Sequence, residues 1–392
     1  MSVALAGLKV IDFSMILPGP FCTQLLADYG ADVIKIEDLN GDRGRRVPPI
    51  MQEQSARFYA INRNKKSLAV DLKKAAGVEI IRRLVAQTDV LVHAYRPGTM
   101  EKLGLGYDDL KTINGRLIYC ALSGYGATGP LRQSAAHDIN IVGLSGVTDL
   151  TGTARGGPAM STVQMAGSVG GSLFAVIAIL IALHHREATG LGQFCDVSMM
   201  DGLISLLAYT LADWSGWGTL PQRGAGLLTG GFACYQIYET SDHKYMSLGA
   251  LEEKFWQDFC ERVERPEYIA LQFDRAAQDE IINNLNALFK SKTQAEWLEY
   301  FNGVDICLTP VLNLEEVINH AQVINREMLI RLSNFQNSGK NMFLAGLPIK
   351  FSATPGELKP VFPKLGEHTD EILSGLGYTK QDIAAFKADK VT

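Results

Sequence analysis

The sequence predicts an α/β protein with a parallel sheet in a large domain and a second, smaller α+β domain. Three observations support this prediction. Strand-like and helix-like segments alternate over the first part of the chain, which is the pattern of a parallel sheet with helical crossovers. The chain has 392 residues, which is too long for one simple core. A glycine-rich stretch at 224–231 then marks a change to hairpin and helix signals.

The first strand–helix–strand unit is the clearest of these signals. Residues 8–13 (Leu-Lys-Val-Ile-Asp-Phe) are apolar and partly β-branched, as in a short buried strand. Pro18 and Pro20 open a helix expected over 21–29, which Gly30 ends, and residues 32–37 form a second strand. Such a unit favours a right-handed parallel crossover. No G-x-G-x-x-G follows the first strand, so we expect neither a nicotinamide nor a flavin cofactor.

The remaining elements follow in order. Further strands of the sheet are expected over 67–72, 89–93, 117–122 and 193–198, and helices over 77–87, 99–103, 173–183 and 199–217. The smaller domain is expected to contain a hairpin of 234–239 and 244–248, then helices over 254–263, 278–290 and 293–301. The large domain therefore spans 1–217 and the small domain with its linkers 218–325. Residues 326–392 return to the large domain through a last helix over 380–387.

Composition excludes several classes of protein. The net charge of -5 gives no basic footprint for nucleic acid. The six cysteines show no C-x-x-C spacing and lie near no paired histidines, so we expect neither a metal site nor a disulfide framework. The N-terminus lacks the pattern of a signal peptide, and the eleven apolar residues 173–183 are too few to span a bilayer. We therefore expect a cytoplasmic protein with no membrane partner.

Cations gather on loops beside several predicted strands. Residues 40–46 carry three arginines, residues 62–66 carry three more cations, and Arg96 follows the strand over 89–93. Guanidinium groups match phosphate oxygens, and ligands of open α/β sheets collect at strand ends. These loops therefore fit a polyanionic ligand, although a charged segment is equally common as a solvated surface.

Residues 122–183 hold the candidate chemistry. A glycine-punctuated turn over 122–130 follows a strand, and glycines there would let backbone amides approach a ligand. His137 and Asp138 come shortly after it, and a histidine beside a carboxylate can act as an acid or a base near neutral pH. The same local pattern also fits a structural histidine.

A set of motifs, together highly specific, covers nearly the whole chain. They are Leu17-Pro-Gly-Pro20, Gly30-Ala-Asp-Val-Ile-Lys-Ile-Glu37, Gly41-Asp42, Asn64-Lys-Lys-Ser67, Asp71-Leu-Lys73, Tyr95-Arg-Pro-Gly98, Lys102-Leu-Gly-Leu-Gly106, Ser123-Gly-Tyr-Gly126, Asp196-Val-Ser-Met-Met-Asp-Gly202 and Leu365-Gly-Glu-His-Thr369. With these motifs the chain resembles the family III CoA-transferases and their sister group, the α-methylacyl-CoA racemases.

The resemblance implies a fold and a ligand. It implies a Rossmann-like large domain closed by the C-terminal segment, an inserted small domain, and two subunits interlocked as a dimer. The ligands implied are an acyl-CoA, with coenzyme A as part of the substrate, and a small carboxylic acid. By position, the CoA-contacting residues would be Ile16, Arg43, Leu72, Lys74, Tyr95, Arg96 and Lys102.

The catalytic residues that the resemblance implies are incomplete. His137, with Asp138 beside it, matches the racemase base, and Glu252 matches the acidic residue that orients that base. The family motif Ala-Asp-x-x-Gly-Gly here reads Ala-Gly-Ser-Val-Gly-Gly over 166–171, so Gly167 stands where the family has its catalytic aspartate. Glycine can act neither as the nucleophile of a transferase nor as the second acid or base of a racemase.

Three functions fit this combination. The chain can be the aspartate-less subunit of a heteromeric CoA-transferase that acts on benzylsuccinate-type acids, with a paralogous subunit supplying the aspartate. It can be a racemase- or epimerase-like homodimer in which His137 is the base. It can also be an acyl-CoA binding subunit without catalysis. Gly167 as an introduced, inactivating substitution is a further alternative.

Overall fold

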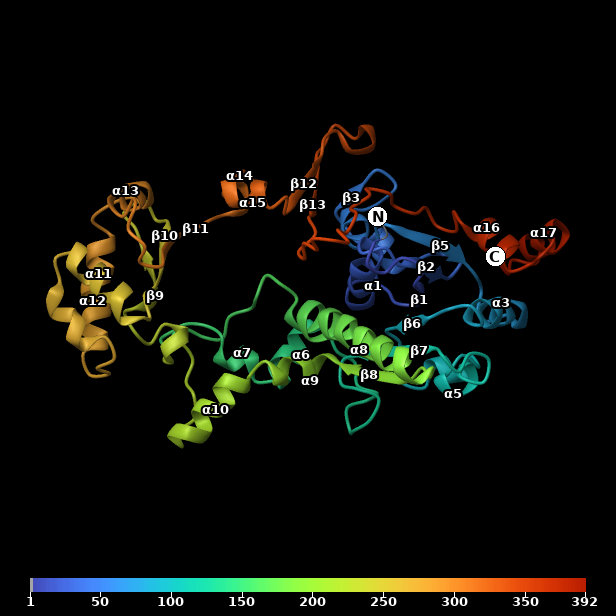
Figure 1. Cartoon of the computed structure of the whole chain (residues 1–392), viewed down its shortest axis with the longest axis horizontal. Coiled ribbons are helices and arrows are strands. Elements are labelled where there is room, and N and C mark those ends of the chain that lie inside the picture. The colour runs from blue at the N-terminus through green and yellow to red at the C-terminus, as the bar shows by residue number, and fades with distance from the viewer. Residues whose placement is uncertain (1–2) are drawn as a thin grey trace. The chain divides into compact units, whose positions relative to one another are not determined.

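A computed structural model describes residues 3–392, which divide into two units (Figure 1). The first unit holds the chain up to Ser145, then Ser161–Leu206 and Gln322–Thr392; the second holds Gly146–Met160 and Leu207–Ala321. The second unit thus begins at 207 rather than 218 and includes a short earlier segment. The helix expected over 199–217 is broken into α9 (Met199–Ser205) and α10 (Ala208–Trp217), which belong to different units.

The first unit is built on a six-stranded sheet in which every neighbouring pair of strands is parallel. The order is β5-β2-β1-β6-β7-β8. The chain adds β2 and β5 on one side of β1, then returns to place β6, β7 and β8 on the other side. This is the doubly wound order of Rossmann-like folds, whose ligands bind where the order reverses. The strands are β1 (Lys9–Asp12), β2 (Asp32–Glu37), β5 (Lys65–Ala69), β6 (Val90–His93), β7 (Ile118–Ser123) and β8 (Phe194–Ser198).

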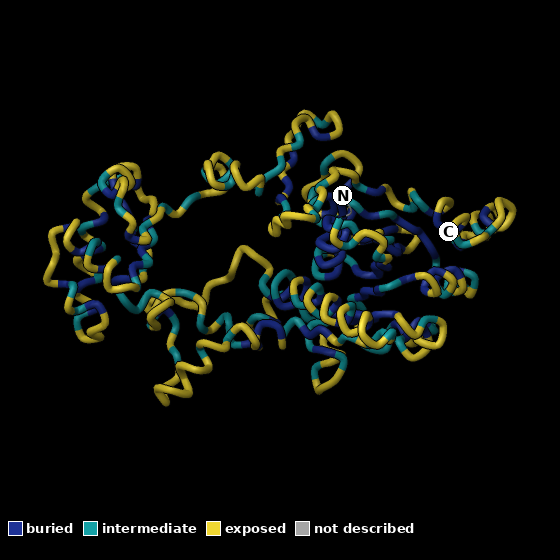
Figure 2. The backbone as a smooth tube through the Cα atoms, viewed as in Figure 1, coloured by how far each residue is buried: buried dark blue, intermediate teal, exposed yellow. Residues whose placement is uncertain are grey.

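Helices cover both faces of this sheet. Alternate residues of β6 and β7 enter different cores, as the two-residue period of a strand requires: Leu91 and Tyr119 face one side, Val92 and Cys120 the other. The first core also contains residues of α3 (Ala75–Val85), α16 (Thr369–Gly375) and α17 (Lys380–Ala388), and the second contains residues of α1 (Pro18–Asp28) and α8 (Phe174–Thr189). Strands β1, β6 and β7 are almost entirely buried, and buried backbone is concentrated around this sheet (Figure 2).

The helix expected over 173–183 is longer than predicted. A π-helix, η2 (Met165–Leu173), runs directly into α8, and the resulting 25-residue helix is long and apolar enough, by length and composition alone, to cross a membrane. The prediction that the apolar helix spans only the eleven residues 173–183 was therefore wrong. Ala175, Ile179 and Ala182 lie in the core beneath the sheet, and Arg186 is paired with Asp89 at 3.0 Å. These contacts are those of a core helix.

Short elements complete the first unit. They are η1 (Arg43–Arg46), β3 (Ile50–Met51), β4 (Gln54–Ser55), α2 (Ala56–Ile61), α4 (Thr99–Lys102), α5 (Tyr107–Leu110), α6 (Asp138–Leu144), α15 (Ala321–Asn325), β12 (Leu329–Leu332), η5 (Phe335–Asn337) and β13 (Met342–Ala345).

The second unit is α+β, as expected. Its antiparallel sheet has the order β11-β10-β9, in which the predicted hairpin is joined by a third strand. Stacked aromatic rings, among them Phe259, Phe289 and Trp297, fill the core between the sheet and three helices. The elements are α7 (Val147–Leu150), η3 (Leu227–Thr229), β9 (Tyr235–Glu239), β10 (Tyr245–Gly249), α11 (Glu253–Arg262), η4 (Pro266–Leu271), α12 (Gln278–Phe289), α13 (Gln294–Tyr300), β11 (Leu308–Val311) and α14 (Leu314–Asn319).

Candidate functional site

The residues predicted to contact CoA lie on loops at one edge of the sheet. Ile16 follows β1, Arg43 follows β2, Leu72 follows β5, and Tyr95 follows β6. These are four neighbouring strands, and parallel strands end at the same edge. The loops after β1 and β6 flank the point where the strand order reverses, which is where open α/β sheets bind ligands.

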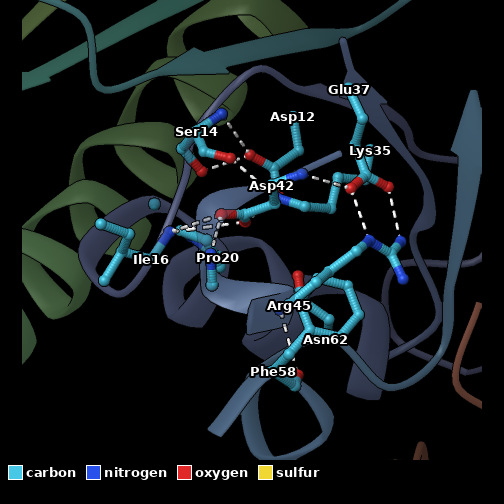
Figure 3. A network of polar contacts seen from close by, with 12 residues as sticks. Asp12, Ser14, Ile16, Pro20, Lys35, Glu37, Asp42, Arg45, Phe58 and Asn62 are labelled. Atoms are coloured by element: carbon cyan, nitrogen blue, oxygen red, sulfur yellow. Dashed lines mark hydrogen bonds and ion pairs between the residues drawn. The ribbon is translucent and has the colours of Figure 1, made fainter. Parts of the chain in front are cut away.

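A buried polar network lies beneath the loop after β1 (Figure 3). The Asp12 carboxylate accepts hydrogen bonds from the Ser14 amide at 2.8 Å and from the Ser14 hydroxyl. Lys35 Nζ donates to the Ser14 carbonyl at 2.7 Å and is paired with the Asp42 carboxylate at 2.9 Å. Asp42 also accepts the Ile16 amide, at 3.3 and 3.4 Å from its two oxygens. All but the exposed Ile16 are buried.

Opposite charges decide the ionisation of this network. Burial alone would raise the pKa of Asp12, but Lys65 and Lys35 outweigh it and hold the pKa at about 2. Burial alone would lower the pKa of Lys35, and Asp12 and Asp42 reverse that effect and raise it. Lys65 has fewer compensating partners, so burial lowers its pKa to about 8. Asp12, Lys35 and Lys65 are therefore charged at neutral pH.

Several cations of the predicted phosphate-binding loops are internal. Arg45 forms a two-pronged pair with Glu37, at 2.7 Å from Nε and 2.6 Å from Nη2, and stacks on the ring of Phe58. Arg63 is likewise paired with Asp28 at 2.7 Å, and both side chains are buried. Residues 62–64 precede β5, and Lys65 and Lys66 are its first two residues, so this segment does not follow a strand of the sheet. The interpretation of these residues as a phosphate clamp was therefore wrong for Arg45, Arg63 and Lys65.

Other cations remain on the surface of the carboxyl edge. Arg43, Arg96 and Lys102 are exposed. Lys74 is half-buried, and its ammonium donates to the carbonyl of Asp389 at the end of α17. Leu72 and Tyr95 pack partly against the core.

The second group of candidate residues lies where α6 meets η2. His137 is exposed and caps the start of α6, where its backbone amide donates to Asn140 Oδ1 at 3.0 Å. Asp138, the next residue, accepts the amide of Gly167 at 2.9 Å through Oδ1. The structure thus brings Asp138 and Gly167 together. The His137 side chain is exposed, and Asp138 is half-buried.

The glycines of η2 serve different purposes. A Cβ at Gly170 would lie 2.4 Å from the carbonyl oxygen of Met199, so this glycine is needed where η2 crosses α9. The atoms nearest to a Cβ at Gly167 would belong to side chains, with Leu17 at 3.1 Å and Asp138 Oδ1 at 3.8 Å. No backbone constraint therefore requires glycine at 167. π-helical turns are rare and are frequent at functional sites.

Two further predictions concern Glu252 and the glycine-punctuated turn. Glu252 is exposed at the start of α11 in the second unit, so its role beside His137 stays a prediction. The amides of Gly126 and Ala127, in the glycine-punctuated turn, are already bound to Ser123 Oγ at 2.9 Å and to the Asp196 carboxylate at 2.9 Å. These two amides are not available to stabilise an enolate.

Cavities and metal ligands add little to this site. A cavity of about 170 Å³ lies at the opposite edge of the sheet, beside Lys9 and Asp32. A second cavity, of about 510 Å³, lies on the small sheet of the second unit beside Tyr235 and Ile237. Across residues 3–392, no cluster of three or more His, Cys, Asp or Glu side chains could hold a metal ion.

Sequence reasoning missed the roles of Lys35 and Asp42. The signal for Lys35 was a charged residue within an apolar strand, Val33-Ile-Lys-Ile36, because a buried lysine needs a carboxylate partner. Only the structure identifies that partner as Asp42.

Comparison with known proteins agrees with this arrangement. Residues 5–369 match CoA-transferase family III. The α-methylacyl-CoA racemase of Mus musculus is 34% identical over 399 residues, which cover 99% of this chain and 97% of that protein. The β subunit of succinyl-CoA–L-malate CoA-transferase of Chloroflexus aurantiacus is 29% identical over 400 residues, covering 100% and 98%.

A solved structure shares the fold as well. The crystal structure of a CAIB/BAIF family protein from Brucella suis has a TM-score of 0.82 and 32% sequence identity, covering 96% of this chain and 100% of that one. The doubly wound sheet and the inserted α+β unit are accompanied by a family match over most of the sequence. The chain belongs to CoA-transferase family III, within the superfamily that includes the α-methylacyl-CoA racemases.

Proposed function

We propose that this protein binds an acyl-CoA thioester at the carboxyl edge of its six-stranded sheet and takes part in moving CoA between carboxylic acids. The observation that supports the proposal is that Ile16, Arg43, Tyr95 and Arg96 follow the neighbouring strands β1, β2 and β6, and that the strand order reverses between β1 and β6. Arg43, Arg96 and Lys102 are exposed there, and guanidinium and ammonium groups suit the phosphates of CoA.

We propose further that the chain is the aspartate-less subunit of a heteromer acting on small acids of the benzylsuccinate type. In CoA transfer a carboxylate attacks the thioester carbonyl, which forms an acyl anhydride and releases the CoA thiolate. The thiolate then attacks the anhydride, so that the acid leaves and the carboxylate becomes a CoA thioester. Gly167 has no side chain for these steps. A paralogous subunit with Ala-Asp-x-x-Gly-Gly would supply it.

The surface of the chain favours association with a second chain, of its own kind or a paralogue. Helix α10 contains no buried residue, although Tyr209 and Trp217 leave 83% and 79% of their surfaces exposed. An isolated ten-residue helix is marginal in water, and exposed apolar surfaces of this kind mark interaction sites. One relative is itself named as a β subunit, which fits an assembly of unlike chains.

A second candidate function is exchange of the α-proton of an acyl-CoA, as in a racemase. His137 favours it, because this histidine is exposed at the start of α6. A neutral imidazole can remove the α-proton of a thioester and return it. In this function the chain works as a homodimer, with Glu252 orienting the base.

Purification of the protein from its own source, followed by native mass measurement and peptide sequencing, tests the leading proposal. Co-purification of a second chain containing Ala-Asp-x-x-Gly-Gly supports the heteromer, and recovery of this chain alone contradicts it. In the second case, incubation with an acyl-CoA in D2O is expected to introduce deuterium at the α-carbon, and His137→Ala should abolish the exchange. No exchange would leave an acyl-CoA binding subunit without catalysis.

A further inference from the structure

Ile16 has a strained backbone. Its φ is +69°, in the left-handed region that β-branched side chains avoid. Eleven non-glycine residues within 3–392 have positive φ, and Ile16 is the only β-branched one among them. Its side chain is 53% exposed, so no gain in core packing compensates for the strain. Such outliers persist only where their surroundings impose them, and they cluster at ligand-binding positions.

The buried network imposes this conformation from two sides of the residue. On the C-terminal side of the Ser14–Ile16 turn, Asp42 accepts the Ile16 amide, and Asp42 is itself fixed by Lys35 at 2.9 Å and by the Gly44 amide at 2.7 Å. On the N-terminal side, Lys35 also holds the Ser14 carbonyl at 2.7 Å. One buried ammonium thus connects both ends of the turn (Figure 3).

Close packing leaves the turn little freedom. The Ser14 side chain rests against Gly19, where an added Cβ would lie 2.1 Å from Ser14 Cβ. Asp12 fixes the same serine through its amide and its hydroxyl. The turn is therefore held by the buried groups below it, and the Ile16 side chain projects outward from it.

We propose that Asp42, fixed by Lys35, is a positioning residue that holds Ile16 in its left-handed conformation so that the Ile16 side chain is already placed to contact CoA. This inference rests on the proposed binding of CoA at this edge. The free protein already holds the strained turn in its binding conformation. Binding of CoA therefore does not have to order this loop, and the affinity for CoA is higher as a result. Neither Asp42 nor Lys35 need touch the ligand for this effect.

Two substitutions at Ile16 separate the backbone from the side chain. Ile16→Gly and Ile16→Ala both remove the exposed side chain, but only glycine adopts positive φ without strain. Relative to Ile16→Ala, Ile16→Gly should raise the melting temperature by about 1–3 °C. It should also bind CoA about threefold or more weakly in isothermal titration calorimetry, since glycine permits other conformations too and the turn must then be ordered on binding.

A third substitution tests the positioning residue itself. Asp42→Asn should weaken CoA binding about tenfold in the wild-type background. In the Ile16→Gly background the loss should be less than about threefold, because residue 16 then has no strained conformation for Asp42 to hold. Asp38→Asn, an exposed carboxylate on the same loop, is the matched control and should leave affinity unchanged. Arg96→Ala should lower affinity without changing the difference in melting temperature between the two Ile16 variants.

The outcomes distinguish the inference from the proposed function. If the wild-type protein does not bind CoA, both fall. If it binds CoA, and Ile16→Gly is neither more stable nor weaker in binding than Ile16→Ala, only the inference falls. Equal loss of affinity from Asp42→Asn in both backgrounds would also overturn it. The Ile16 comparison stands even if Asp42→Asn fails to fold, because Ile16 is a surface residue.

Discussion

At the scale of single residues, Gly167 differs from its neighbours because its surroundings do not require glycine. Gly167→Asp should therefore fold, with a loss of unfolding free energy of about 1 kcal/mol as Leu17 shifts from its 3.1 Å contact. It places a carboxylate at the position that the proposed function assigns to the nucleophile of the partner subunit. After incubation with an acyl-CoA, we expect this variant to form a covalent CoA thioester without a partner chain, because the new carboxylate takes the CoA and the acyl group leaves as the free acid. Mass spectrometry of the intact protein would detect it.

Two control variants make this prediction specific. Gly167→Asn has the same shape but no nucleophilic carboxylate, and it should form no adduct. Gly170→Asp should destabilise the protein severely, because its Cβ would lie 2.4 Å from a backbone oxygen. If the Gly167→Asp protein is folded and binds CoA but forms no adduct, the result contradicts the assignment of position 167 as that of the nucleophile.

At the scale of elements, strand β6 ends in a residue that makes the fold sensitive to acid. His93 is 5% exposed, its Nδ1 accepts the Tyr95 amide at 3.2 Å, and its ring packs on Tyr119. Burial lowers the pKa of His93 to about 4, so the folded protein keeps this histidine neutral where the unfolded chain, with a pKa of 6.5, takes up a proton.

The sign of the pH dependence follows from this difference. Above pH 6.5 the histidine is neutral in both states, and its contribution to stability is fully present. Between pH 6.5 and 4 the unfolded state binds more protons, so the unfolding free energy should fall by up to about 3 kcal/mol. Urea unfolding of the wild type and of His93→Asn, which keeps an acceptor for Tyr95, measures this contribution. An equal loss in both proteins would refute it.

Prediction from sequence succeeded for elements whose signal lies within the element itself. It failed where contact with a residue distant in sequence determines the structure. The strand over 32–37 has the predicted bounds in β2. Its apolar, β-branched residues favour a buried strand whichever residues pack against them. The exposed arginines and the buried Arg45 look alike in sequence, since burial of Arg45 depends on Glu37 and Phe58. Likewise the break between α9 and α10 arises from the division into units, and no glycine or proline marks it.

The same limit applies to the candidate site. Its location at the carboxyl edge could be predicted, because the order of strands and loops implies it. The contact between Asp138 and the Gly167 amide joins residues 29 positions apart and could not. The strain at Ile16 is also invisible in sequence, because a left-handed turn is normally predicted from glycine or asparagine.

At the scale of the whole molecule, the exposed side chains of α10 predict that the protein does not function as a single chain. Tyr209 and Trp217 expose most of their surfaces on a helix with no buried residue, so in water this apolar area is unfavourable by about 25 cal/mol per Å². Light scattering of the purified wild-type protein should therefore show at least a dimer. The double variant Tyr209→Ser, Trp217→Ser should shift the mass toward one chain.

A matched substitution elsewhere on the surface separates a specific interface from general stickiness. Leu314 is 81% exposed at the start of α14, and Leu314→Ser should leave the assembly unchanged. Far-ultraviolet circular dichroism of the α10 double variant should show that the rest of the fold is retained, because neither aromatic side chain contributes to a core. A wild-type protein that is monomeric at all concentrations would contradict the assignment of α10 as an interface and, with it, both the interlocked dimer and the heteromer.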